Sequence, residues 1–135
     1  MTPDFRQAAV ELLADLAPDG SSAQLAEGAA QACDRLAKHL SRLLGETGVR
    51  MLLKRSTVLA TAAFPWLAAA TASDDASGLR DAMVQQDPGS ITEAFAAILA
   101  GFVGLLERLI GEPLVRRLLD EVWPRIFTKT EKDTP

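Results

Sequence analysis

A twelve-residue stretch of this chain, RLLGETGVRMLL at residues 42–53, occurs a second time as RLIGEPLVRRLL at residues 108–119. Eight of the twelve positions are identical, and the third position exchanges leucine for isoleucine. Both copies place a glycine between two stretches whose apolar residues recur every three or four positions, the spacing of an amphipathic helix. Because glycine adopts the positive φ that often ends a helix, each copy predicts a helix, a glycine corner and a second helix.

The similarity between the two copies extends towards the N-terminus. With a shift of 66 residues, residues 25–53 align with residues 91–119 without a gap and with eleven identities over 29 positions. One further helix is expected before each helical pair. The sequence therefore predicts an all-α fold, a single six-helix bundle built from two pseudo-symmetric three-helix repeats at about residues 3–70 and 75–124.

The residues that the two copies share are those that such a corner needs. Gly45 and Gly111 provide the positive φ, and the glutamate after each glycine lies at the positive end of the next helix. Each glutamate precedes an arginine, Arg50 or Arg116, by four residues, so an ion pair can form along one helix face. We therefore interpret the repeat as a structural corner in which only the arginines are candidates for a further role.

Hydrophobic periodicity also predicts which residues face the core. The helix before Gly45 carries an apolar stripe that includes Leu43. The helix after Gly45 is expected to continue to Pro65, where the proline ring stops or bends it. Leu59 and Ala63 are expected on the inward face of this second helix.

A helix is expected to run to Gly111, and its middle at residues 94–106 is apolar on nearly every face, so this helix is expected to be the most buried. Gly101 and Gly104 lower its helix propensity by about 1 kcal/mol each relative to alanine, which predicts the close approach of a neighbouring helix. The uncharged apolar runs at residues 58–72 and 94–106 are shorter than the roughly 18–20 residues that span a bilayer, so buried helices are expected. The residues expected to be almost fully buried are Phe95, Ile98, Leu99, Phe102 and Leu106.

The length of the chain predicts one domain, at residues 1–127, followed by a flexible polar tail at residues 128–135.

The single cysteine, Cys33, permits no disulfide within the chain, and the N-terminus lacks the basic and apolar regions of a secretory leader. A cytoplasmic location is therefore expected. The abundance of alanine and the excess of arginine over lysine favour a GC-rich bacterial genome.

The chain lacks the residue patterns of common catalytic and metal sites. His39 is the only histidine, and it is six residues from Cys33 on a different helix face, so neither a metal site nor a cysteine–histidine pair is expected. The glycine motifs that bind nucleotides and the H-E-x-x-H motif are absent. The sequence therefore predicts a protein that is not an enzyme and that needs no cofactor or metal.

Charge is distributed unevenly along the chain. The net charge is −4, yet residues 35–55 alone carry +5. A basic stretch in an acidic protein indicates an anionic partner, although a solvated helix face gives the same pattern. The candidate partner-binding residues are basic side chains of the two copies and two tryptophans beside prolines: Arg42, Arg50, Lys54, Arg55, Arg108, Arg116, Arg117, Trp66 and Trp123.

These features lead us to expect a non-enzymatic protein–protein interaction or adaptor domain. Its partner is expected to be a protein with an acidic segment, and a homodimer is one possible state. Two alternatives remain open: a helical domain that binds anions or nucleic acid through residues 35–55, and a membrane-active helical protein. The acidic net charge argues against nucleic acid, and the short apolar runs argue against a membrane.

Overall fold

The computed structural model describes residues 5–72 and 76–123, and every regular element in these residues is helical. The expected all-α fold is thus confirmed, with one 3-10 helix that the sequence did not predict. The tail expected at residues 128–135 lies outside the described residues. In chain order the elements are α1 (Phe5–Leu16), α2 (Ser22–Leu44), α3 (Glu46–Ala60), the 3-10 helix η1 (Pro65–Ala72), α4 (Ala76–Met83), α5 (Pro88–Ile110) and α6 (Glu112–Val122).

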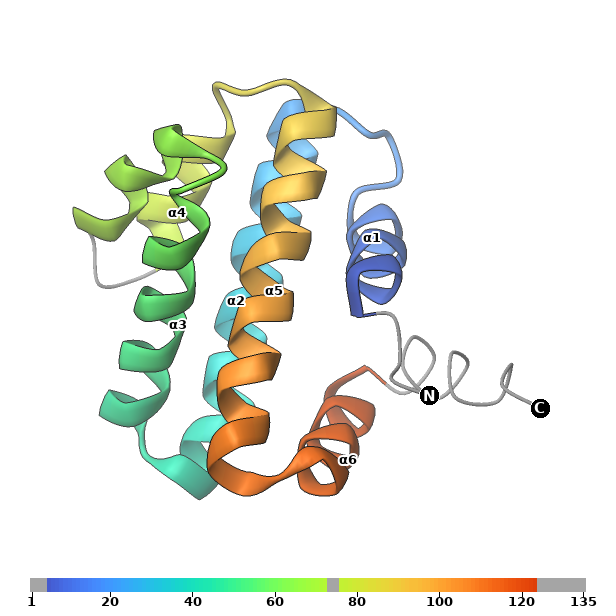
Figure 1. Ribbon diagram of the computed structural model, residues 1–135. Helices are drawn as coiled ribbons and strands as arrows, with labels where there is room; N and C mark the ends of the chain where they lie inside the picture. The colour runs from blue at the N-terminus through green and yellow to red at the C-terminus, as the bar shows by residue number, and fades with distance from the viewer. Residues whose placement is uncertain (1–4, 73–75, 124–135) are drawn as a thin grey trace.

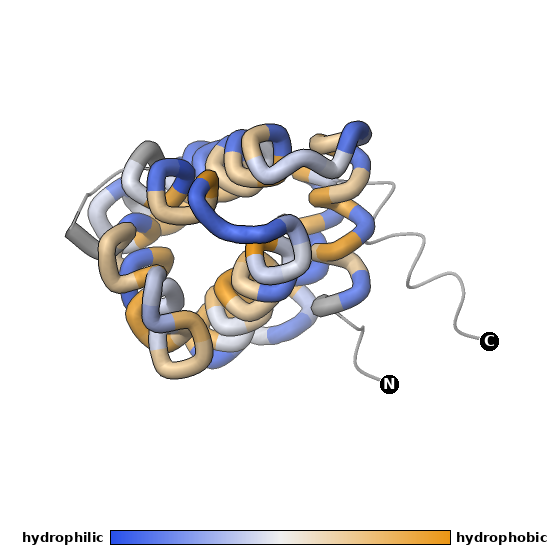
Figure 2. Tube along the Cα trace, turned by 90° about the horizontal axis from the view of Figure 1, so that it is seen from above, coloured by the Kyte–Doolittle hydropathy of each residue, from blue (hydrophilic) through white to orange (hydrophobic). Residues whose placement is uncertain are grey.

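Two long helices form the middle of the molecule. α2 and α5 have 23 residues each and run in the same direction, with α2 behind α5 in Figure 1. On one flank of this pair lie α3, η1 and α4, and on the other lie α1 and α6. Hydrophobic and hydrophilic residues alternate along the helices in Figure 2, as they do in amphipathic helices that bury one face.

The core is centred on α5, which packs against α1, α2, α3 and α6. The sequence prediction for this helix is confirmed, because Phe95, Ile98, Leu99, Phe102 and Leu106 are each at most 4% exposed. By length and composition α5 could also cross a membrane, but half of its most apolar window is buried inside the bundle. The core helices of globular proteins meet the same criterion, so this property alone does not indicate a membrane protein.

The expected close approach at the glycines of α5 is present only in part. A Cβ atom added at Gly101 would lie 3.9 Å from the Cβ of Ser56, an ordinary contact, and one added at Gly104 would meet nothing within 4 Å. The tightest glycine contact in the described residues lies between α1 and α2. There a Cβ at Gly28 would lie 3.2 Å from the Cβ of Leu16, so this glycine lets the two helices approach closely.

The two glycine corners have the predicted positive φ. Gly45 has φ 86° and ψ 145°, and Gly111 has φ 89° and ψ 149°. These ψ angles lie outside the left-handed helical region that ends many helices, so the corner differs from the common left-handed glycine cap. This combination of φ and ψ lies close to a region of backbone conformations that almost only glycine occupies. The corner therefore restricts the residue type more strongly than a left-handed cap does.

α3 is shorter than the sequence suggested. It ends at Ala60, and η1 begins at Pro65. Proline disfavours helical backbone at the residue before it, so the chain turns between the two elements. Leu59, which was expected to face the core, is 57% exposed, and Ala63 is exposed as well, so the prediction for both residues is wrong.

Candidate interaction surface

Large hydrophobic side chains are exposed mainly in one part of the molecule. Four of the six in the described residues lie between residues 43 and 59: Leu43 is 55% exposed, Met51 67%, Val58 49% and Leu59 57%. The sequence had placed Leu43 in the buried stripe of α2, and this prediction is wrong. Single exposed hydrophobic residues are common on proteins, but a group of them in one region marks a contact surface.

Helix geometry brings most of these residues together. Since α3 turns by 100° per residue, Met51, Arg55 and Val58 lie in one stripe, with Lys54 on one side and Leu59 on the other. The opposite face of α3 is buried through Val49, Ser56 and Ala60. We call the exposed set, Met51, Lys54, Arg55, Val58 and Leu59, the α3 outer face.

Basic side chains lie on α3 and in the last turn of α2. Arg50 forms an ion pair with Glu46, with 2.7 Å between Nη2 and Oε1, and both side chains are more than half exposed. Arg42 in the last turn of α2 and Arg55 in α3 are exposed, and within the described part of the chain neither has an ion-pair partner. The surface is therefore both apolar and positively charged.

The second glycine corner repeats only part of this arrangement. Arg116 pairs with Glu112 at 3.3 Å, Arg108 and Arg117 are exposed, and Leu109 is 64% exposed. Both corners lie at the same end of the bundle, the lower end in Figure 1. The alignment of the two copies pairs Met51 with Arg117, so α6 has a basic residue at the position where α3 has an apolar one.

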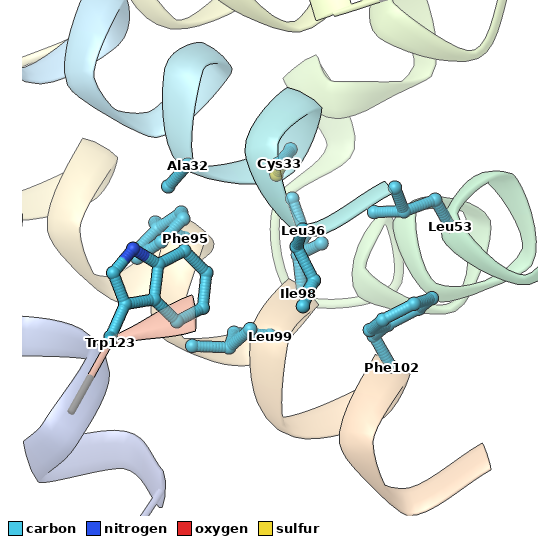
Figure 3. Close-up of a pocket in the computed structure, with 9 residues that line it drawn as sticks. All are labelled: Ala32, Cys33, Leu36, Leu53, Phe95, Ile98, Leu99, Phe102 and Trp123. Carbon is cyan, nitrogen blue, oxygen red and sulfur yellow. The ribbon is translucent and has the colours of Figure 1, made fainter. Parts of the chain in front are cut away.

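The two tryptophans occupy different environments. Trp66 at the start of η1 is partly buried and makes an edge-to-face contact with Phe64, with 6.1 Å between ring centroids and 69° between ring planes. Trp123 is only 6% exposed and packs into the core, where Figure 3 shows it beside Phe95 and Leu99. Trp123, a candidate for partner binding in the sequence, therefore contributes to the core and not to the exposed surface.

Trp123 lines an apolar cavity of about 10 Å³, which is close to the smallest volume that holds one water molecule. Cys33 also lines it, and burial, together with the charge of Asp34, raises the pKa of this thiol to about 12. The thiol therefore stays protonated at neutral pH and lacks the thiolate character of a nucleophile. The nine lining residues are Ala32, Cys33, Leu36, Leu53, Phe95, Ile98, Leu99, Phe102 and Trp123 (Figure 3).

One polar contact between distant segments has a structural role. His39 of α2 and Glu121 of α6 lie 2.9 Å apart, measured from Nε2 to Oε1, and this contact joins two helices that are far apart in the chain. No group of three histidine, cysteine, aspartate or glutamate residues in the described ranges is arranged to hold a metal ion. His39 is thus explained by helix packing.

The structure therefore places Arg50, Lys54 and Arg55 on the helix that carries exposed Met51, Val58 and Leu59, and Arg42 beside exposed Leu43 in the chain at the end of α2. The sequence analysis did not propose these hydrophobic residues as part of a binding surface. The sequence did contain one signal of this surface. Met51 is apolar, whereas the residue aligned with it in the otherwise similar second copy, Arg117, is basic. A comparison with known proteins gives no further guide to this surface. No protein-family model, no curated protein and no solved structure matches this chain.

Proposed function

We propose that this chain is a non-enzymatic protein-interaction domain, an adaptor, whose binding surface is the α3 outer face together with the end of α2. The observation that carries the proposal is the group of exposed hydrophobic residues, Leu43, Met51, Val58 and Leu59, among exposed basic residues. Burial of such side chains by a partner stabilises a complex by roughly 25 cal/mol for each Å² of apolar surface removed from water.

The composition of the surface favours a protein partner over nucleic acid. Methionine and arginine are enriched in protein interfaces, and both are exposed here, at Met51 and Arg55. Binding to a phosphate backbone depends on positive charge and does not require exposed apolar residues. The basic residues would mainly steer an acidic partner to the surface and orient it, while the hydrophobic residues would supply affinity.

We also propose that the fold consists of two three-helix halves, α1–α3 and α4–α6, related by an approximate two-fold axis along α2 and α5. Three observations support this: the equal lengths of α2 and α5, the matching glycine corners, and the placement of α3 and α6 on opposite flanks. The packing is also reciprocal, since α1 contacts α5 and α4 contacts α2. In this arrangement the mixed apolar and basic helix face belongs to the first half, as far as the described residues 5–72 and 76–123 go.

Paired charge reversals test the proposed function. Binders are captured from an extract of the cells that make the protein, identified and purified, and their dissociation constants are measured by calorimetry. Arg42→Glu with Arg55→Glu should weaken binding by about tenfold or more, because it removes the attraction of an acidic partner. Arg108→Glu with Arg117→Glu is the matched control, since it makes the same change of charge in the second half, and it should leave the dissociation constant nearly unchanged.

The same experiment can contradict the proposal. If both pairs of reversals weaken binding equally, the effect comes from total charge and not from the α3 outer face. If neither pair weakens the binding of any captured protein, the interaction surface lies elsewhere. Circular dichroism checks that each variant is folded, which is expected because exposed charges contribute little to stability.

A further inference from the structure

We infer that the segment bound by the α3 outer face is an acidic amphipathic helix of a partner protein. This inference rests on the proposed function and specifies the chemistry and shape of the ligand. The inference follows from the helical backbone of the domain, from the spacing of the exposed apolar side chains and from the charges beside them.

The backbone of the domain restricts how a partner segment can bind. No strand occurs in residues 5–72 and 76–123, and the backbone groups within α3 bond to one another, so this surface has no sheet edge for an extended peptide to join. The grooves that bind proline-rich peptides are lined by aromatic rings, and the α3 outer face has none. Packing of a second helix against α3 is the remaining common mode, because it uses side chains only.

The exposed apolar residues have the spacing of a helix–helix contact. Met51 and Val58 are seven residues apart and Leu59 follows, so the stripe covers about 12 Å, or two turns of helix. A partner helix with apolar side chains at positions i, i+3 or i+4, and i+7 presents a stripe of the same length. Exposed Ala62, just beyond the end of α3, would let such a helix lie close to the domain there.

The charges select an acidic partner and disfavour a second copy of this chain. Lys54 and Arg55 lie between Met51 and Val58, so carboxylates beside the apolar stripe of a partner helix would meet positive charges. A two-fold dimer through this face would place the same basic residues of two copies against each other. The helices that bind membrane surfaces separate their apolar and basic residues onto opposite faces, whereas here both kinds share one face.

Selection from a random peptide library tests the inference. Displayed peptides of about 16 residues, which as helices span about 24 Å, are selected on the immobilised full chain and their sequences are determined. We expect enriched peptides to be acidic, to carry apolar residues at spacings of three and four, and to gain helical circular dichroism on binding. Affinity should fall at least about tenfold for Met51→Ser with Leu59→Ser, and it should fall with salt for the wild type.

Matched variants and vesicles supply the controls. Val84→Ser with Leu109→Ser also removes two exposed hydrophobic residues, one after the end of α4 and one in α5, that are not part of the α3 outer face, and it should change the affinity by less than about twofold. Vesicles of phosphatidylserine and phosphatidylcholine should not sediment the chain. Sedimentation that Met51→Ser with Leu59→Ser abolishes would assign the face to a membrane and overturn the inference.

Three further results would also overturn it: no enrichment of any peptide, enrichment without acidic residues or helical spacing, or affinity that the α3 variant does not change. The proposed function would survive these results if captured proteins still lose binding with Arg42→Glu and Arg55→Glu. Failure of both experiments would reject both proposals.

Discussion

Gly45 and Gly111 make the same pair of hydrogen bonds at two corners that lie 66 residues apart in the chain. The Gly45 amide donates to the carbonyl of Ser41 at 3.0 Å, and its carbonyl accepts from the amide of Val49 at 3.2 Å. The Gly111 amide donates to Glu107 at 2.9 Å, and its carbonyl accepts from Val115 at 3.2 Å. Each glycine therefore caps the end of one helix and the start of the next, and it is the single residue between the two helices.

Replacement of Gly45 or Gly111 with alanine should lower the free energy of unfolding by about 1–3 kcal/mol each, because a side chain is strained at this backbone conformation. Chemical denaturation measures the effect. A Cβ at Gly45 would meet nothing within 4 Å, so a loss of stability would report backbone strain and not overlap. Gly104→Ala is the control: this glycine lies inside a helix with open space around it, so alanine should stabilise by about 1 kcal/mol.

Replacement of Phe102 with alanine should lower the free energy of unfolding by about 3–5 kcal/mol, because Phe102 is fully buried on the central helix and the change leaves a cavity. Phe102→Leu keeps much of the volume and should cost clearly less. Thermal or chemical unfolding of both variants provides the comparison. Equal stability of Phe102→Ala and the wild type would mean that α5 is not the core helix.

The parts of this fold that follow from the sequence are those set by local patterns. Helical periodicity and the repeat were sufficient to predict an all-α fold. The corner at Gly45 was predictable because the helix signals on both sides meet at a glycine. The burial of Phe102 was predictable because the middle of its helix is apolar on nearly every face.

The features that the sequence did not predict depend on tertiary packing. Leu59 is exposed because α3 buries the face that carries Val49, Ser56 and Ala60, and a periodic pattern does not show how much of a helix its neighbours cover. Trp123 beside a proline resembled an exposed anchor, but α6 directs it into the core. The contact of His39 with Glu121 joins residues 82 apart and has no local signal.

The N-cap of α5 should make stability depend on pH. The Asp87 carboxylate accepts hydrogen bonds from the hydroxyl of Ser90 at 2.8 Å and from its amide at 3.1 Å, and these bonds lower the pKa of Asp87 below 3.8. A depressed carboxyl pKa stabilises the folded state above pH 3.8, and this contribution is lost as the pH falls through the lower pKa of the folded protein.

Asp87→Ala should therefore lower the melting temperature at neutral pH, and the difference from the wild type should shrink under acidic conditions. Asp87→Asn keeps a capping oxygen but has no charge to titrate, so it should retain much of the stability without this dependence on pH. Calorimetric melting curves between neutral and strongly acidic pH compare the three proteins. A difference between Asp87→Ala and the wild type that stays constant with pH would contradict the assigned role of the carboxylate.

Cys33 should be almost unreactive in the folded protein. Its side chain is buried on α2 and the pKa of its thiol is raised to about 12, so both access and thiolate formation are suppressed near pH 8. We expect labelling by a thiol reagent such as dithionitrobenzoate to be limited by opening of the fold and to become rapid only in denaturant. Val84→Cys in a Cys33→Ala background places a cysteine at an exposed position and should react at once under native conditions. If native Cys33 reacts as fast as that control, then α2 is not packed against α5 and α6 as described, and the cavity beside Trp123 is open to solvent.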